Sequence, residues 1–122
     1  MEKWIFKILR PHEWRAACTN PKFDGAPVDL ADGFIHFSTC KQLQETANKH
    51  FADSNHIYVL AFNAESWSAK DLRWEPSRGG ALFPHVYAPL NIQLSEEQWE
   101  LSKEPGNDFN LSPIYEWIAR HD

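Results

Sequence analysis

Two histidines interrupt runs of aromatic and β-branched residues, His36 within residues 33–39 and His85 within residues 83–87. If each run is a strand, its side chains alternate between two faces, so each histidine points away from its apolar neighbours. An imidazole fills a core poorly because its ring nitrogens need hydrogen-bond partners when buried. The two segments therefore predict a polar site built on a sheet.

Other polar side chains share the strand faces of these histidines. Ser38 follows His36 by two residues, and Tyr87 follows His85 by two. Thr39 stands at the expected start of a helix, where free N–H groups suit an anion. We expect His36, Ser38 and Thr39 to contact a polar ligand, with His85 and Tyr87 as a second wall of the same site. The structural alternatives are a histidine bonded to nearby backbone, a Thr39 that only caps the helix, and an edge strand with exposed polar residues.

A third segment, residues 73–80, combines a carboxylate with two guanidinium groups. Glu75 is of the type that serves as a general base or orients a sugar hydroxyl, and Arg78 can bind a phosphate through two nitrogens. Trp74 neighbours Glu75, so we expect its ring to contact the ligand. The structural alternative is an Arg–Glu ion pair that holds a turn, which carries little functional meaning.

Metal and thiol chemistry receive less support. His36, His85 and a carboxylate have the composition of a two-histidine, one-carboxylate site. The chain has no HxH or HExxH spacing, so we predict no metal. Cys18 and Cys40 lack the signature of a cysteine nucleophile, and we expect them to pack as small apolar residues. We find no signal peptide and therefore expect reduced thiols and a cytoplasmic location.

Composition limits the classes of partner. The chain has 122 residues, 43% of them hydrophobic, which predicts a single domain over residues 1–122 with a real core. The net charge of −5 argues against an extended nucleic-acid surface, which needs a basic face. No apolar stretch approaches the roughly 20 residues needed to cross a bilayer. Six Trp, eight Phe and three Tyr indicate that some rings line a pocket.

Periodicity and turn residues predict an α+β fold with a mixed or antiparallel sheet and flanking helices. His56 to Phe62 is the expected central strand, and the Thr39/Gln42 pair predicts a capping box for the helix after it. Pro84 and Pro89 place at least one end of their segment at an edge or a bend. We expect strands over 4–9, 33–37, 56–62, 71–75 and 83–94, helices over 12–19, 40–51, 95–101 and from 112 onward, and a loop over 20–32.

Three motifs, DGFIHFST (32–39), WEPSRGG (74–80) and FPHVY (83–87), resemble the hallmarks of a family of short, mostly bacterial proteins of unknown function. The early Lys7-Ile8 and Glu13-Trp14 pairs also fit that family. Its fold resembles the ADP-ribosylation fold of NAD-using transferases. In that fold a strand similar to residues 33–38 lines the nicotinamide–ribose pocket, and a related histidine strand occurs in RNA 2′-phosphotransferases.

The resemblance implies an enzyme that binds NAD or another nucleotide-like ligand bearing ADP-ribose. Active members of the fold usually carry a histidine or arginine on the first strand, where this chain has Lys7. That departure keeps open a non-catalytic module that senses a small metabolite or docks a partner protein. The implied roles are a ribose contact for His36 supported by Ser38, ring stacking for Trp74 or Tyr87, acceptor activation by Glu75 or His85, and a phosphate contact for Arg78.

Overall fold

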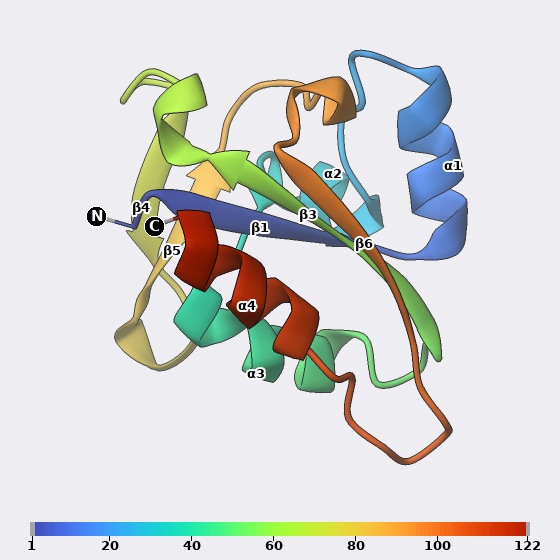
Figure 1. Cartoon of the computed structure of the whole chain (residues 1–122). Coiled ribbons are helices and arrows are strands. Elements are labelled where there is room, and N and C mark those ends of the chain that lie inside the picture. The colour runs from blue at the N-terminus through green and yellow to red at the C-terminus, as the bar shows by residue number, and fades with distance from the viewer. Residues whose placement is uncertain (1, 122) are drawn as a thin grey trace.

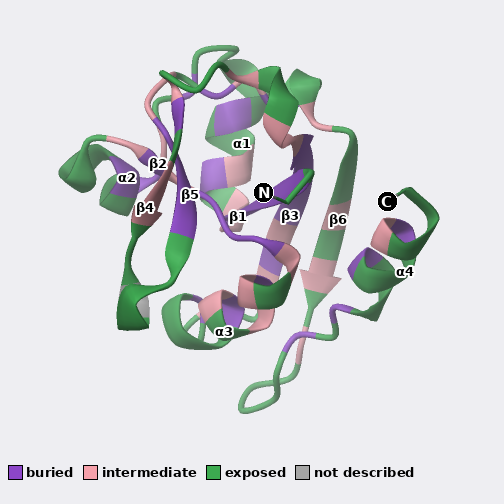
Figure 2. Cartoon of the chain, turned by 90° about the vertical axis from the view of Figure 1, so that its left-hand side faces the viewer, coloured by how far each residue is buried: buried purple, intermediate pink, exposed green. Residues whose placement is uncertain are grey.

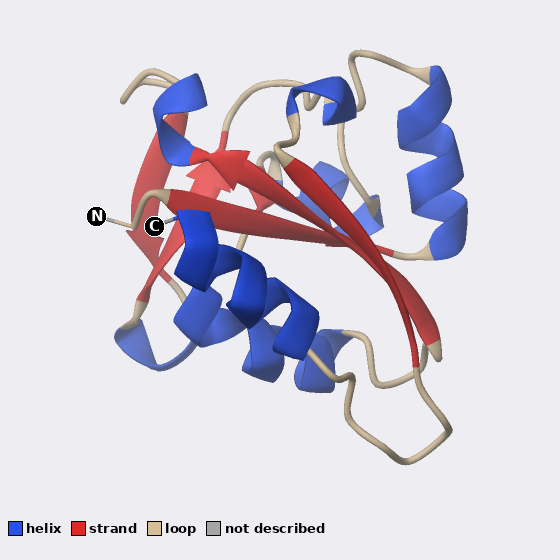
Figure 3. Cartoon of the chain, in the orientation of Figure 1, coloured by secondary structure: helices blue, strands red, loops and turns tan. Residues whose placement is uncertain are grey.

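The computed structural model describes residues 2–121, except the side chain of Arg78, and has an α+β architecture with two antiparallel sheets. The first sheet has the order β1 (Trp4–Leu9), β3 (His56–Asn63), β6 (Glu97–Ser102). The second has the order β2 (Ile35–His36), β5 (Leu82–Val86), β4 (Leu72–Pro76). Figures 1 and 3 show the two sheets and the helices around them. The α+β class is confirmed, and β3 is the central strand of its sheet as expected.

Four helices accompany the sheets in the described chain: α1 (Pro11–Thr19), α2 (Pro27–Asp32), α3 (Cys40–His50) and α4 (Ser112–His121). Helices α3 and α4 cover one face of the first sheet (Figure 1), where Phe6 packs with Leu43 and Ile114. The opposite face packs against α1 and the second sheet, with Ile5 and Val86 in the same cluster. Figure 2 shows the buried residues concentrated on β1, β3 and β5, between these layers.

Strand β1 buries a charged residue. Side chains alternate along a strand, so Lys7 lies on the same face as Ile5 and Leu9, which pack toward the second sheet. Lys7 is only 4% exposed. A buried ammonium requires an anionic partner and further acceptors. The interior between the two sheets must therefore hold a carboxylate.

The segment after β2 links the two sheets. Phe6 and Ser38 exchange backbone hydrogen bonds, N to O, at 2.8 and 2.9 Å. The chain thus pairs with β5 over Ile35–His36 and then turns to β1. The expected strand over 33–37 is accordingly only two residues long. The capping box of the next helix is present, since Thr39 N donates to Gln42 Oε1 at 3.0 Å.

The expected loop over 20–32 is wrong in its second half, because it contains α2. Pro27 stands at the first helical position, where its missing N–H costs nothing. The carboxylate of Asp29 accepts from Ala26 N at 2.8 Å and so satisfies a free donor at the helix start. Gly33 ends the helix with a φ of +85°, which glycine adopts without strain.

The expected helix over 95–101 is also wrong, because residues Glu97–Ser102 form β6 along β3. Trp99 and Leu101 alternate with exposed polar residues and pack, half-buried, on the cluster beneath α4. An alternation of two fits a strand, and it buries both side chains on one face. The acidic residues of this segment favour a helix in the prediction from sequence. The observed alternation of half-buried and exposed residues, with a period of two, is that of a strand.

Two prolines lie in and after β5. Pro84 belongs to the central strand of its sheet, where a proline normally breaks the ladder. Its carbonyl accepts from Phe37 N at 3.0 Å on the β2 side, where β2 itself has ended. The N–H that Pro84 lacks would face that same side, past the end of β2, so the ladder with β4 is unaffected. Pro89 lies beyond the end of β5, so this end of the segment has left the sheet, as its proline predicts.

Candidate functional site

One face of the second sheet carries most of the predicted polar residues. In its register, His36 pairs with His85, and His85 pairs with Arg73 on the other side. The neighbouring pairs, which include Val86, lie on the opposite face and belong to the core. Glu75 and Tyr87 follow at spacings of two and so extend the polar face. The structure brings His36, Glu75, His85 and Tyr87 together.

His85 is held by Glu75. Its Nδ1 lies 2.8 Å from Glu75 Oε1, and Tyr87 OH donates to the same oxygen at 2.7 Å. These hydrogen bonds, first that of Tyr87 and then that of His85, lower the pKa of Glu75. Burial lowers the pKa of His85, although the Glu75 bond acts in the opposite direction. The pair at neutral pH is therefore a neutral imidazole, with Nδ1–H on an ionised carboxylate.

His36 lies between two carboxylates. Its Nδ1 is 2.7 Å from Asp29 Oδ1, and its Nε2 is 2.8 Å from Asp32 Oδ2. The backbone N–H of His36 also donates to Asp29 Oδ1, at 3.0 Å. Each ring nitrogen of His36 therefore faces a carboxylate oxygen, one from within α2 and one from its last residue. His36 and His85 thus sit in contrasting surroundings.

Asp29 is the buried carboxylate that Lys7 requires. Its side chain accepts from Lys7 Nζ at 2.8 Å, and Lys7 Nζ also donates to His36 O at 3.1 Å. Burial opposes ionisation of Asp29, but the His36 hydrogen bond and the Lys7 charge outweigh it and lower the pKa of Asp29 to about 2. Gly25, with a φ of +115°, lets the chain approach closely, since a Cβ there would lie 2.4 Å from the Asp29 Cβ.

Aromatic rings cover the two histidines. Phe34 stacks on His85 with ring centroids 4.1 Å apart and is tilted against His36 at 4.6 Å. The His36 and His85 centroids are 5.4 Å apart. Arg73 lies over the Tyr87 ring at 4.2 Å, and Phe34 is 5.2 Å from Tyr87. The site therefore combines planar rings with hydrogen-bonding groups, as ligand sites do.

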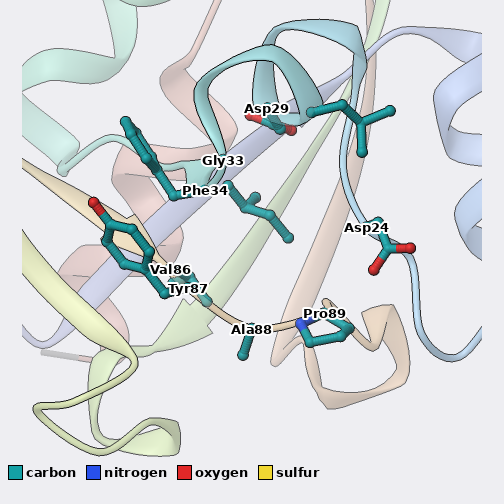
Figure 4. A pocket seen from close by; sticks show the side chains of 10 residues that line it. Asp24, Asp29, Gly33, Phe34, Val86, Tyr87, Ala88 and Pro89 are labelled. Atoms are coloured by element: carbon teal, nitrogen blue, oxygen red, sulfur yellow. The ribbon is translucent and has the colours of Figure 1, made fainter.

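A pocket of about 260 Å³ adjoins this cluster. Figure 4 shows the rings of Phe34 and Tyr87 on one side of it, with Asp29 on the α2 side and Asp24 across from the rings. Its walls come from α2, the start of β2 and the segment after β5. The lining residues are Asp24, Asp29, Leu30, Gly33, Phe34, Ile35, Val86, Tyr87, Ala88 and Pro89.

Several sequence-predicted residues lie away from the cluster. Ser38 is buried and its hydroxyl donates to Thr46 Oγ1 at 3.0 Å, while Thr39 begins α3. Trp74 points to the opposite face from Glu75 and packs against the core. The side chain of Arg78 lies outside the described part of the chain.

Sequence reasoning missed three contributors: Asp29, Asp32 and Phe34. Both aspartates fall in the predicted loop over 20–32, although Pro27 followed by an acidic residue two positions later is a helix-start signal. Phe34 falls in the predicted strand over 33–37, with no role in the predicted site. Nothing in the sequence pairs Asp29 with Lys7, which lies 22 residues away.

Two further properties can be stated for the described residues. No group of three or more His, Cys, Asp or Glu side chains among them is arranged to hold a metal ion. No helix among them has both the length and the apolar character needed to cross a membrane.

Comparisons with known proteins place the chain in a family. The family model described as "Protein of unknown function (DUF952)" matches residues 8–97. The crystal structure of protein CC0527 from Caulobacter crescentus is 43% identical with a TM-score of 0.83, covering 91% of this chain and 96% of that one. The solution NMR structure of CC0527 is 43% identical with a TM-score of 0.78, covering 91% and 95%. Among curated proteins, none matches this chain.

Proposed function

The chain belongs to the DUF952 family of proteins of unknown function, and from its site we propose that it binds a nucleotide-type ligand, NAD or ADP-ribose, as a transferase-like enzyme. The observation that carries this proposal is the pairing of two histidines in contrasting surroundings, 5.4 Å apart on one sheet face. Titratable groups whose environments differ in this way are typical of acid–base catalysis.

In the proposed chemistry His85 is the base. Its Nδ1–H is held by Glu75 at 2.8 Å, which leaves the Nε2 lone pair as the acceptor. Because burial lowers the pKa of His85, the ring is unprotonated at neutral pH and can take a proton from an acceptor hydroxyl. Glu75 orients the ring. His36, set between Asp29 and Asp32, supplies a hydrogen-bond donor to the ligand.

The residues fit part of such a ligand. A pocket of about 260 Å³ is at the low end for small-molecule sites, so it suits a ring or a sugar and not a whole dinucleotide. Phe34 and Tyr87 offer ring faces at its entrance. NAD, when bound, supplies a ribose carbon that carries nicotinamide as a leaving group. The resemblance of the motif around His36 to the ADP-ribosylation fold is what suggests this ligand class.

A second candidate, a non-catalytic module that senses a small metabolite, is favoured by one observation. Phe34 stacks on His85, and both ring nitrogens of His36 lie against carboxylates. The Phe34 ring covers His85, the proposed base, and the His36 nitrogens already have partners. Both features are consistent with a ligand that is bound but not converted.

Ligand-induced thermal stabilisation tests the nucleotide class. A ligand at 100 times its Kd adds roughly 2.7 kcal/mol, which raises the Tm of a domain of this size by about 10 °C. We expect such a shift with NAD or ADP-ribose. No shift with NAD, ADP-ribose or nucleotide 2′-phosphates at millimolar concentration would sink the nucleotide proposal.

Nicotinamide release separates the enzyme from the sensor. We expect the wild-type protein to release nicotinamide from NAD, and His85→Ala and Glu75→Gln to lose at least about 100-fold in rate, the usual range of acid–base catalysis. His12→Ala, at an exposed histidine of α1, is the matched control and should keep the full rate. Binding of NAD with no release by the wild type would favour the sensor.

A further inference from the structure

The partners of the two ring nitrogens of His36 differ greatly in solvent exposure. On the inner side, Asp29 is 1% exposed and is fixed by Lys7 Nζ and Ala26 N, each at 2.8 Å. Moving Asp29 away from His36 would also separate it from Lys7 and leave two buried charges unpaired, which is costly. The inner nitrogen is therefore committed to Asp29, and the plane of the His36 ring is set by it.

The outer partner is different. The side chain of Asp32 is 47% exposed, at the last residue of α2, and its Oδ2 lies 2.8 Å from His36 Nε2. Exposed ion pairs of this kind are weak, because water competes with both groups. A ligand that reaches His36 must meet this donor and this carboxylate together.

A sugar hydroxyl matches that pair of groups. A hydroxyl is both a donor and an acceptor, so one oxygen can accept from His36 Nε2 and donate to Asp32. The carboxylate of Asp32 has a second oxygen, which can accept from an adjacent hydroxyl. Carboxylates recognise the ribose hydroxyls of dinucleotides in the same way and exclude a 2′-phosphate.

The surrounding charges disfavour a phosphate at this position. Asp29 and Glu75 add two more carboxylates around the histidines. Of the described cations nearby, Lys7 is already paired with Asp29, and Arg73 lies over the Tyr87 ring. A phosphate beside Asp32 would therefore face the like charge of Asp32 itself, with Asp29 and Glu75 close by.

We propose that Asp32 is a specificity-determining residue, which with His36 selects a sugar bearing a free vicinal diol and rejects the same sugar phosphorylated on that diol. The proposal deepens, and rests on, the nucleotide-type site proposed above. Asp32 touches the sugar hydroxyls and takes no part in the proton transfer at His85.

Two pairs of probes test the proposal. The first pair, methyl β-D-ribofuranoside and its 2-deoxy analogue, is titrated while the ring nitrogens of His36 are followed by long-range ¹H–¹⁵N NMR. The second pair, ADP-ribose and its 2′-phosphorylated form, is compared by thermal stabilisation. Asp53→Asn removes an exposed carboxylate that pairs with Arg10 and does not line the pocket, and it is the matched control for Asp32→Asn.

We expect the riboside to shift the His36 signals and to bind roughly 10-fold to 100-fold more tightly than the deoxy analogue, as for a hydrogen bond to a charged group. Asp32→Asn should remove most of this preference for the riboside, and most of the preference against the 2′-phosphate. The control Asp53→Asn should keep both preferences. Equal binding of the riboside and deoxy probes overturns the inference, as does an unchanged preference in Asp32→Asn.

ADP-ribose binding without any change in the His36 signals overturns this inference alone. A selective response to the riboside without ADP-ribose binding overturns only the nucleotide class, and no response to any probe overturns both.

Discussion

The buried ion pair of Lys7 and Asp29 makes the acid stability of this protein predictable. Asp29 has a pKa of about 2 in the folded chain against 3.8 in its ordinary state. At 1.36 kcal/mol for each pKa unit, this difference is worth about 2 kcal/mol of stability. Because the folded pKa is the lower one, this stabilisation is complete above about pH 5 and disappears as the pH falls toward 2 and below.

Replacing Asp29 removes this contribution and leaves Lys7 without its anionic partner. In Asp29→Asn the ammonium of Lys7 stays buried without an anionic partner, and its hydrogen bond to His36 O remains. Breaking a buried pair in this way costs about 3–5 kcal/mol at neutral pH. The difference in unfolding free energy between wild type and Asp29→Asn should then shrink by about 2 kcal/mol between pH 6 and pH 2, since the wild type loses its advantage there.

Urea unfolding followed by tryptophan fluorescence measures both quantities. The control is Asp53→Asn, an exposed partner of Arg10 whose loss should change stability by less than about 1 kcal/mol. Lys7→Met is a second test of the same pair, because it should raise the pKa of Asp29 and flatten the acid dependence. A wild-type advantage over Asp29→Asn that stays constant from pH 6 to pH 2 would refute the reasoning.

Three further outcomes follow from the same geometry. Because its hydrogen bond to Glu75 raises the pKa of His85 against the effect of burial, Glu75→Gln should lower that pKa further in an NMR titration; a rise would contradict the assigned contact. The Glu75 bond also raises the pKa of Tyr87 above 10.0, so ultraviolet titration should show this phenol returning toward 10.0 in Glu75→Gln. Gly25→Ala should destabilise the fold by about 2 kcal/mol or more, through its positive φ and the Cβ contact with Asp29. The control Gly106→Ala, also at positive φ but in open space, should cost less in urea unfolding.

The amino-acid sequence determined the parts of this protein that depend on neighbours along the chain. The cap at Thr39, the central strand β3 and the shared face of His85 and Tyr87 all follow from spacings of two to four residues. Local periodicity carries this information because side-chain direction repeats within each element.

Only the tertiary structure decided which polar groups meet and which do not. Lys7 and Asp29 are paired because β1 and α2 pack against each other, and no local pattern encodes that contact. Trp74 packs against the core and Arg73 lies on the polar face because β4 pairs with β5 in one register, and a shift by one residue would exchange them. The choice follows from burial, since only this register places apolar side chains between the sheets and leaves the charged ones in reach of water.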